Sequence, residues 1–478
     1  MPEMQANGWR PGRLGDICRV NPDKRDGSWP HDEIEYIDIS SVGTGALSTP
    51  PTKMPIAEAP SRAQRLVRPG DTILATVRPN LRSFAYLSET KPNTVVSTGF
   101  AVLRAIDQSD QRFIYYAVSA RSFTEYLTAR AHGSAYPAVS VAAIEEAEFP
   151  VPPPEVRHSI GTVLGALDDK IEQNRRTARA LERLARAIFR AWFVDFEPVK
   201  AKAAGATAFP GMPQPVFDAL PTRFVDSAIG PVPDGWEVKA IGDVVTAKGG
   251  GTPSTTNSDY WDGGEHCWAT PKDMSRLSHP VLLDTERRIT DAGVNSISSG
   301  ILPVGTVLMS SRAPVGYLAI AGVPTAINQG FIAMVCDGPL PPTYVLNWAF
   351  TSMDAIKAHA SGTTFPEISK KNFRPLPVVQ PTDDVIAAYE QTADPLFELI
   401  TMCVKENEQL AVMHDYLLPK LLSGQVRVPV GAQHAAPLQP LQPLQPLQPL
   451  QPLQPPPVSQ PTEPLQPQPP GQAVRKIG

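Results

Sequence analysis

Residues 150–193 read PVPPPEVRHSIGTVLGALDDKIEQNRRTARALERLARAIFRAWF, a proline cluster followed by a long helical pattern. Proline ends the preceding strand and suits the first turn of a helix. From Ile160 onward, apolar residues recur at alternating steps of four and three, which is the heptad spacing of a helix that pairs with another helix. Asn174 occupies the one polar position of this seam, where a buried amide can fix the pairing register. The stretch predicts a pairing helix of about 40 residues, roughly 60 Å long.

A second stretch with the same pattern follows PLPVVQP at residues 375–381. Its apolar positions keep the heptad steps as far as Leu417, so a second helix of similar length is expected. Arginines crowd the first helix and carboxylates the second, and opposite charge favours pairing of one with the other over self-association. The alternative, that the arginines are solvated or contact nucleic-acid phosphates, stays open. The residues expected to pair the helices are Ile171, Asn174, Leu181, Ile188, Leu399, Leu410 and Leu417.

The chain repeats itself around these helices. Gly8-Trp9 and Leu14-Gly15-Asp16 are answered, at one common separation, by Gly235-Trp236 and Ile241-Gly242-Asp243. Three longer pairs of blocks follow in the same order: RPGDTILATVRP (68–79) with LPVGTVLMSSRAP (302–314), TVVSTGFAVLR (94–104) with TAINQGFIAMVC (325–336), and AHGSAYPAVS (131–140) with ASGTTFPEIS (360–369). Shared Gly-Asp turns alone do not explain five blocks in one order, so the sequence predicts two duplicated domains.

The expected fold class is α+β, with two duplicated mixed α/β domains separated by two long antiparallel coiled-coil helices. Short β-branched runs broken by glycine and proline indicate strands in each half. Because each helix follows its own globular half, an antiparallel pair would relate the halves by an approximate two-fold axis within one chain. The expected division is 1–153 for the first domain, 154–197 for the first helix, 198–233 for a linker, 234–380 for the second domain, 381–425 for the second helix and 426–478 for a disordered tail rich in proline, glutamine and leucine.

Composition limits the class of protein. The formal charge of −5 argues against a protein that coats nucleic acid with a wholly basic surface, but it permits a local positive surface. The hydrophobic fraction of 42% is enough for folded domains, and no apolar run is long enough to predict a membrane span. The N-terminal residues lack the apolar run of a secretory signal. The four cysteines are far apart and lack zinc-ligand spacing, so reduced thiols in a cytoplasmic protein are expected.

Motifs for intrinsic catalysis are missing from the sequence. Asp234 and Glu237-Val-Lys239 resemble a nuclease metal site only superficially, because two residues alone separate the carboxylates. The glycine-rich run 248–252 lacks the order of a phosphate-binding loop. The sequence contains neither a dinucleotide fingerprint nor the Asn/Asp-Pro-Pro-aromatic tetrapeptide of adenine methyltransferases. A non-catalytic chain without a metal or cofactor of its own is therefore expected.

Several stretches resemble the specificity subunits of type I restriction–modification systems. GGGTPSTTNSDYWDGGEHCWATPKDMS (249–275) is similar to a recurrent opening of one class of target recognition domain in that family. SGTTFPEISKKNF (361–373) resembles the glycine-threonine block before the final strand. LERLARAIFRAWFVDFEPV (181–199) and LLPKLLSGQVRV (417–428) resemble the ends of the two spacer helices. The resemblance spans roughly residues 8–428 and is weaker in the first domain than in the second.

This resemblance implies two target recognition domains, each reading one half of a split double-stranded DNA target, with spacer helices between them. It also implies two docked methyltransferase subunits that methylate adenine with S-adenosylmethionine, and motor–nuclease restriction subunits that use ATP and Mg²⁺. All of these cofactors would reside on the partner subunits, and no membrane is involved. Two other interpretations stay open: a coiled-coil scaffold protein without DNA readout, and an enzyme with an unrecognised site.

Basic side chains in the turns of each half are the candidates for DNA contact. Arg78 and Arg312 follow paired strands at what the sequence blocks present as matched positions, and arginine binds guanine edges or phosphates. Tyr136 and Phe365 lie in equivalent Gly-x-x-aromatic-Pro blocks, where core packing is favoured over DNA contact. The remaining candidates are basic residues of the loop-rich second domain: Lys272, Lys370, Lys371 and Arg374.

Overall fold

The computed structural model describes residues 8–26, 29–362 and 366–428. Phe365, and the expected tail from residue 429 onward, lie outside the described residues. Within the described part, none of the helices combines the length and the apolar character that crossing a membrane requires.

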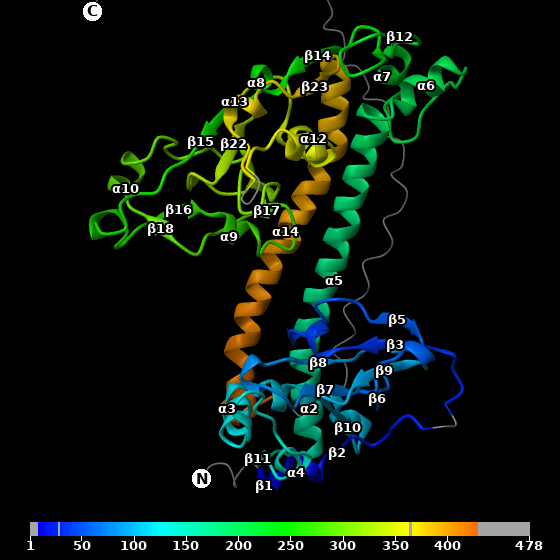
Figure 1. Ribbon diagram of the computed structural model, residues 1–478, viewed down its shortest axis with the longest axis vertical. Coiled ribbons are helices and arrows are strands. Elements are labelled where there is room, and N and C mark those ends of the chain that lie inside the picture. Colours follow the sequence, from blue (N-terminus) through cyan, green and yellow to red (C-terminus); the bar gives the residue numbers. More distant parts are fainter. Residues whose placement is uncertain (1–7, 27–28, 363–365, 429–478) are drawn as a thin grey trace, which may run out of the picture. The chain divides into compact units, whose positions relative to one another are not determined.

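Two helices of 40 residues each, α5 (Pro154–Phe193) and α14 (Asp383–Leu422), pack against each other (Figure 1). They run antiparallel, because Ile160 near the start of α5 shares a core with Leu421 at the end of α14. Trp192, at the end of α5, instead shares a core with Tyr389 near the start of α14. Proline occupies the first turn of α5, where its missing N–H needs no partner. The fold class expected from the sequence is confirmed.

The buried seam of α5 follows the expected positions, with Asn174, Leu181 and the intervening Ala178 buried, and Ile171 and Ile188 half-buried. In α14, Leu410 and Leu417 are half-buried.

Leu399 of α14 was expected to pair the helices, and this prediction is wrong: Leu399 is 42% exposed, whereas the adjacent Ile400 is fully buried. One buried row in this half of α14 consists of Val385, Tyr389, Ala393, Phe397 and Ile400, at steps of four, four, four and three, and Ile386 and Ala388 are buried beside it. A straight helix has 3.6 residues per turn, so a seam assigned at 3.5 drifts by about 20° per heptad. This half of α14 packs on the second domain as well as on α5, and its buried face follows the straight-helix period.

Each half of the chain folds into two sheets and a closing strand pair. In the first half, the described strands form a sheet in the order β2-β10-β7-β8-β4, another in the order β5-β3-β9-β6, and the pair β1-β11. The bounds are β1 Arg10–Arg13, β2 Cys18–Val20, β3 Glu33–Ile37, β4 Thr44–Gly45, β5 Thr52–Pro55, β6 Ala63–Leu66, β7 Thr72–Ala75, β8 Phe84–Tyr86, β9 Thr94–Ser97, β10 Phe100–Ala105 and β11 Glu148–Val151.

The second half repeats this topology except at β6, in whose place the described residues show a single bridge between Leu302 and Thr325. Its sheets have the orders β15-β22-β19-β20-β17 and β18-β16-β21, with the pair β14-β23. Two parallel pairings recur as well: β3 with β9 matches β16 with β21, and β4 with β8 matches β17 with β20. The bounds are β14 Glu237–Ala240, β15 Thr246–Gly249, β16 His266–Ala269, β17 Val281–Leu282, β18 Arg288–Ile289, β19 Val307–Ser310, β20 Leu318–Ala321, β21 Thr325–Ile327, β22 Phe331–Val335 and β23 Pro377–Gln380.

Short helices join these strands and cover the sheets. The first domain contains α2 (Gln111–Ser119), α3 (Arg121–Ala129) and α4 (Val141–Glu145), together with the 3-10 turn η4 (Pro79–Leu81). The second contains α8 (Ile241–Val244), α9 (Pro271–Met274), α10 (Asp291–Asn295), α11 (Pro342–Thr351), α12 (Met353–Ala358) and α13 (Lys370–Phe373). The segment expected as a linker holds α6 (Glu197–Ala203), α7 (Gln214–Ala219), β12 (Phe224–Val225) and β13 (Val232–Pro233), and its Val199 and Phe217 are buried in the core of the second domain.

Each domain is fixed to both long helices by buried contacts. The first domain joins α5 through an ion pair between Arg157 and Asp110 at 2.8 Å, with both side chains buried. Gly161 and Gly165 let α2 approach α5, because a Cβ on Gly161 would lie 3.2 Å from the backbone nitrogen of Phe113. The second domain shares a buried core with both helices, and the exposed Arg186 guanidinium of α5 also lies 3.6 Å from the centre of the Phe350 ring.

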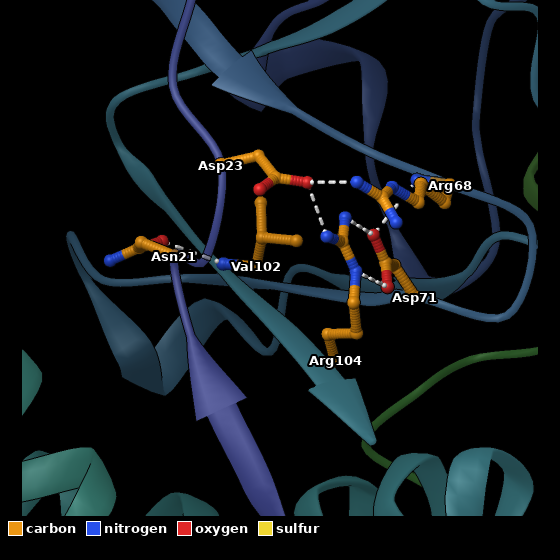
Figure 2. Close-up of polar contacts among 6 residues, drawn as sticks. All are labelled: Asn21, Asp23, Arg68, Asp71, Val102 and Arg104. Carbon is orange, nitrogen blue, oxygen red and sulfur yellow. Dashed lines mark hydrogen bonds and ion pairs between the residues drawn. The ribbon is translucent and has the colours of Figure 1, made fainter. Parts of the chain in front are cut away.

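A buried ion network stiffens the first domain (Figure 2). The Arg104 guanidinium donates twice to Asp71, at 2.9 and 2.7 Å, and also to Asp23, which accepts from Arg68 at 2.8 Å. The hydrogen bond from Arg104 is the main reason that the pKa of Asp23 lies below its usual value. Beside this network, Asn21 Oδ1 accepts a hydrogen bond from the backbone N–H of Val102 at 2.9 Å. The network ties the segment after β2 to β7 and β10.

Candidate nucleic-acid interface

In both domains, turns from separate strands meet at one edge of the sheets. In the first domain, Thr76 N–H donates to Gly99 O at 2.8 Å, and Val139 N–H donates to Thr76 O at 2.9 Å. In the second, Ser311 N–H donates to Gly330 O at 2.8 Å, and Ile368 N–H donates to Ser311 O at 3.0 Å. The turn after β7 or β19, the glycine before β10 or β22, and residues 138–139 or 367–368 therefore form one surface in each domain. We call this surface the reading edge.

The matched glycines allow the segment after β3 or β16 to join the reading edge. A Cβ on Gly99 would lie 2.2 Å from Ile39 Cδ1, and one on Gly330 would lie 3.0 Å from Pro271 Cγ. A Cβ at either position would force its neighbour to shift, so glycine is favoured at both positions. Lys272, directly after Pro271, is thereby brought to the reading edge of the second domain.

Arg78 and Arg312 are not at matched positions, which corrects the alignment drawn from the sequence blocks. Ala75 pairs with Phe100 as Ser310 pairs with Phe331, so Arg312 corresponds to Val77. Arg78 corresponds to Ala313, and both adopt left-handed backbone angles, with φ of 51° and 57°. The sequence comparison aligned the arginines themselves, whereas the strand register places them one residue apart.

Arg78 is exposed and is held by its own hairpin. Its backbone N–H donates to Pro137 O at 2.7 Å, and its guanidinium lies 4.7 Å from the centre of the Tyr136 ring. The Tyr136 side chain is 69% exposed, so the expected core packing of this aromatic residue is wrong. A guanidinium stacked on an exposed ring is oriented before any ligand arrives.

Lys272 and Arg312 line a common hollow of about 510 Å³ at the reading edge of the second domain, together with Thr270, Tyr317 and Asn328. Each cation has a carboxylate partner. Lys272 Nζ lies 2.9 Å from Glu286 Oε2, which also binds Arg276 at 2.7 Å, and Arg312 lies 3.7 Å from Glu367. Hydrogen bonding to Lys272 is the first reason that the pKa of Glu286 is lowered. These pairs are exposed, so a phosphate or a base edge can compete for the cations at small cost.

Lys370, Lys371 and Arg374 do not line this hollow. Arg374 is directed toward β15, where it donates to Ala247 O at 3.2 Å. Lys370 lies along Gly249, whose added Cβ would be 3.2 Å from the lysine Nζ, and Lys371 is exposed. The structure therefore brings Lys272 and Arg312 together and leaves the other three on the far side of the α13 turn as separate predictions.

Sequence reasoning missed the carboxylates that balance these cations. Glu286 lies between β17 and β18, and Glu367 lies in the hairpin at the position that Ala138 occupies in the first domain. The one signal available in the sequence was that Glu367 stands where the matching block of the first domain has Ala138. Within the described residues, no group of three or more His, Cys, Asp or Glu side chains is placed to hold a metal ion.

Comparison with known proteins places this architecture. The family model for the type I restriction modification DNA specificity domain matches residues 6–183 and 233–401. The chain is 25% identical over 465 residues to the type I restriction enzyme HindI specificity subunit of Haemophilus influenzae, covering 87% of this chain and 99% of that protein. It is 36% identical over 191 residues to the MjaIX specificity subunit of Methanocaldococcus jannaschii, covering 40% of this chain and 44% of that protein.

A solved structure agrees at the level of the fold. The S subunit of a type I restriction–modification system from M. genitalium superposes with a TM-score of 0.57 at 14% identity, covering 86% of this chain and 96% of that one. The family model matches once in each duplicated half, and the match to the HindI subunit spans nearly that whole protein. The chain therefore belongs to the type I restriction–modification DNA specificity family, as a specificity subunit.

Proposed function

We propose that this specificity subunit reads a bipartite DNA target, one half-site with each reading edge, while α5 and α14 set the gap between the half-sites. The observation that carries the proposal is a shared frame with different side chains at matched positions. Ser40 in the first domain corresponds to Lys272, and Val77 corresponds to Arg312, by strand register. Ala138 corresponds to Glu367 in the hairpin.

These differences bear on base recognition. Arginine and lysine donate to the O6 and N7 atoms of guanine, and glutamate accepts from the N4 amino group of cytosine. The second reading edge therefore has two hydrogen-bond donors, Lys272 and Arg312, and one acceptor, Glu367. The first reading edge presents Ser40 and Val77 at the corresponding places, so the two edges suit different half-sites.

The helix pair supports the spacing role. Helices of 40 residues are about 60 Å long, enough to separate two modules by one turn of DNA, about 34 Å. Two rigidly connected readers gain affinity when their separation suits the DNA, because binding of the second becomes intramolecular. The buried contacts that fix each domain to both helices favour a constant gap.

Partner subunits supply the chemistry in this proposal. Two methyltransferase subunits would bring S-adenosylmethionine, and motor–nuclease restriction subunits would bring ATP and Mg²⁺, with the assembly acting on DNA in the cytoplasm. The exposed face of α14 supports docking of other proteins, because Leu399, Met402, Val412, Met413 and Tyr416 are all at least 42% exposed.

Mapping methylated adenines in the host genome, with and without this gene, tests the proposal. A split motif that disappears with the gene is the expected result. Exchange of residues 234–380 for those of another specificity subunit should then change one half of the motif alone. If every methylated motif remained after the gene was removed, the proposal would be contradicted. A change in both halves of the motif after the exchange would contradict independent reading by the two domains. A scaffold without DNA readout would leave the methylated motif unchanged when either reading edge is altered.

A further inference from the structure

Four arginines of the first domain form a surface without carboxylate partners. Arg78, Arg82, Arg121 and Arg130 make no ion pair within the residues that the structure describes, and we call them the arginine patch. Five other arginines of the same domain each pair with an aspartate or glutamate: Arg13, Arg62, Arg68, Arg104 and Arg112.

The members of the patch flank η4 and lie at the two ends of α3. Arg82, at the end of η4, donates to Thr124 Oγ1 of α3 at 3.2 Å and to Ser119 O at 2.8 Å. Arg121 and Arg130 lie in and directly after α3, and both are exposed. Arg78 immediately precedes η4, so the patch continues directly into the reading edge.

Aromatic rings lie beside three of these guanidinium groups, and Arg82 is 5.6 Å from the centre of the Phe84 ring. Arg78 lies over Tyr136 at 4.7 Å, and Arg130 lies over Tyr126 at 3.7 Å from the ring centre. Stacking orients a guanidinium without neutralising its charge, so its N–H groups stay available. The acidic side chains nearby, Glu125 on α3, Glu148 on β11 and Asp415 on α14, form no ion pair with the patch in the described structure.

The second domain has no equivalent of this patch among its described residues. Its α12 packs on the turn after β19, where a Cβ on Gly316 would lie 2.6 Å from Met353 Sδ, as α3 packs on η4 in the first domain. Yet α12 carries one acidic residue, Asp354, and one basic residue, Lys357, while Ala313 replaces Arg78. The positive surface is therefore a property of the first domain alone.

We propose that the arginine patch binds the phosphate backbone of double-stranded DNA beside the first half-site and adds affinity that does not depend on base sequence. This inference rests on the proposed function, because the patch adjoins the first reading edge. Arginine binds phosphate through paired N–H groups, and backbone contacts position a protein on DNA without reading sequence. An unneutralised cluster in a chain of net charge −5 favours this ligand, since phosphate binding releases counterions. The patch thus adds a salt-dependent contribution to the affinity of the first domain.

The test measures how the affinity of the specificity subunit, purified with its methyltransferase subunits, falls with salt. The probe is a duplex carrying the mapped target, and the variants are Arg78→Gln, Arg121→Gln, Arg130→Gln and the triple substitution. Each lost phosphate contact should reduce the slope of log Kobs against log salt by about 0.9, and the triple substitution by about 2–3. The methylated motif should stay unchanged. Arg82 is left intact because it supports the end of α2.

Arg223→Gln is the matched control, because Arg223 is an arginine with 82% side-chain exposure that is paired with Asp234 in the linker. Its substitution should leave the slope unchanged. An unchanged slope in the triple variant would overturn the proposal, and so would loss of the methyltransferase subunits, which would assign the patch to an acidic protein partner. If the wild-type complex showed no preference for the target duplex, the proposed function would be refuted. Binding of the DNA backbone by the patch would still stand if the triple substitution reduced the salt slope.

Discussion

Replacing Asn174 by leucine is predicted to weaken the helix pair, although leucine is the commoner residue in such seams. Asn174 is 4% exposed near the middle of α5. Its Nδ2 donates to Glu406 Oε2 at 2.7 Å and to Asn407 Oδ1 at 3.0 Å, both on α14. Its Oδ1 accepts from Lys170 Nζ at 3.1 Å. Leucine would leave three polar groups on the two helices short of a partner.

The magnitude follows from these contacts. A hydrogen bond to a charged group contributes about 1.5–3 kcal/mol, and one between neutral groups about 1 kcal/mol. Glu406 is 44% exposed, so water replaces part of what Asn174 supplies. Burying the leucine side chain offsets roughly 1 kcal/mol more. We therefore expect Asn174→Leu to lower the free energy of local opening of the helix pair by about 1–2 kcal/mol.

Hydrogen exchange of the central amides of α5 measures this opening free energy. The control is Asn174→Leu combined with Glu406→Leu, which removes the polar partner from both helices and should recover most of the loss. A double-mutant cycle between the two positions should give a coupling of about 0.5–1.5 kcal/mol. Protection equal to that of the wild type in Asn174→Leu, with no coupling to Glu406, would refute the reasoning.

The effect should also depend on pH. Partial burial works against ionisation of Glu406, but hydrogen bonds from Asn174 and Lys170 outweigh it and hold the pKa of Glu406 below its usual value. A carboxyl group with a depressed folded pKa stabilises the fold above its unfolded pKa, near 4.3, and loses that contribution as pH falls through the folded value. The difference between wild type and Asn174→Leu should therefore be constant near neutral pH and shrink below about pH 4. A difference undiminished at pH 3 would contradict this.

Three other substitutions separate the structural roles. Leu181→Asp should cost about 3–5 kcal/mol in urea unfolding because it buries a charge, whereas Leu399→Asp, on the exposed face of α14, should cost less than about 0.5 kcal/mol. Adding seven residues to both α5 and α14 lengthens each by about 10.5 Å and should widen the gap of the methylated motif; an unchanged gap would argue against a spacer. Asp71→Asn should destabilise the first domain by about 3–5 kcal/mol in hydrogen exchange because it uncouples buried Arg104, and protection in the second domain should not change.

The helix pair was predictable because its signal is periodic and local. Proline clusters and heptad spacing located α5 and α14, and the single polar seam position identified Asn174. Leu399 was misplaced because one seam was extrapolated across a helix that packs on two surfaces at once. The period of a helix is encoded locally, whereas the second packing partner is a property of the tertiary fold.

The reading edge was harder to predict, because its geometry depends on hydrogen-bond register between distant strands. Matching blocks located the turns correctly but aligned Arg78 with Arg312, since both precede a proline closely. The pairings of β7 with β10 and of β19 with β22 place them one residue apart. Tyr136 was expected in the core because aromatic residues usually pack there, and only the hairpin geometry turns it toward solvent.

The one-residue offset has a consequence for how two similar domains can read different DNA. Residues that set the frame are the same in both halves: Gly99 and Gly330 each face a close neighbour that would have to shift to admit a Cβ. Arg78 has left-handed backbone angles, as Ala313 does, whereas Arg312 precedes that turn position, so moving an arginine by one position redirects its guanidinium without changing any strand pairing. Arg78 is thus stacked on a hairpin tyrosine, while Arg312 lines a hollow beside Lys272. The side chains available for base recognition can therefore differ between the two domains while the strands and turns that carry them keep the same arrangement.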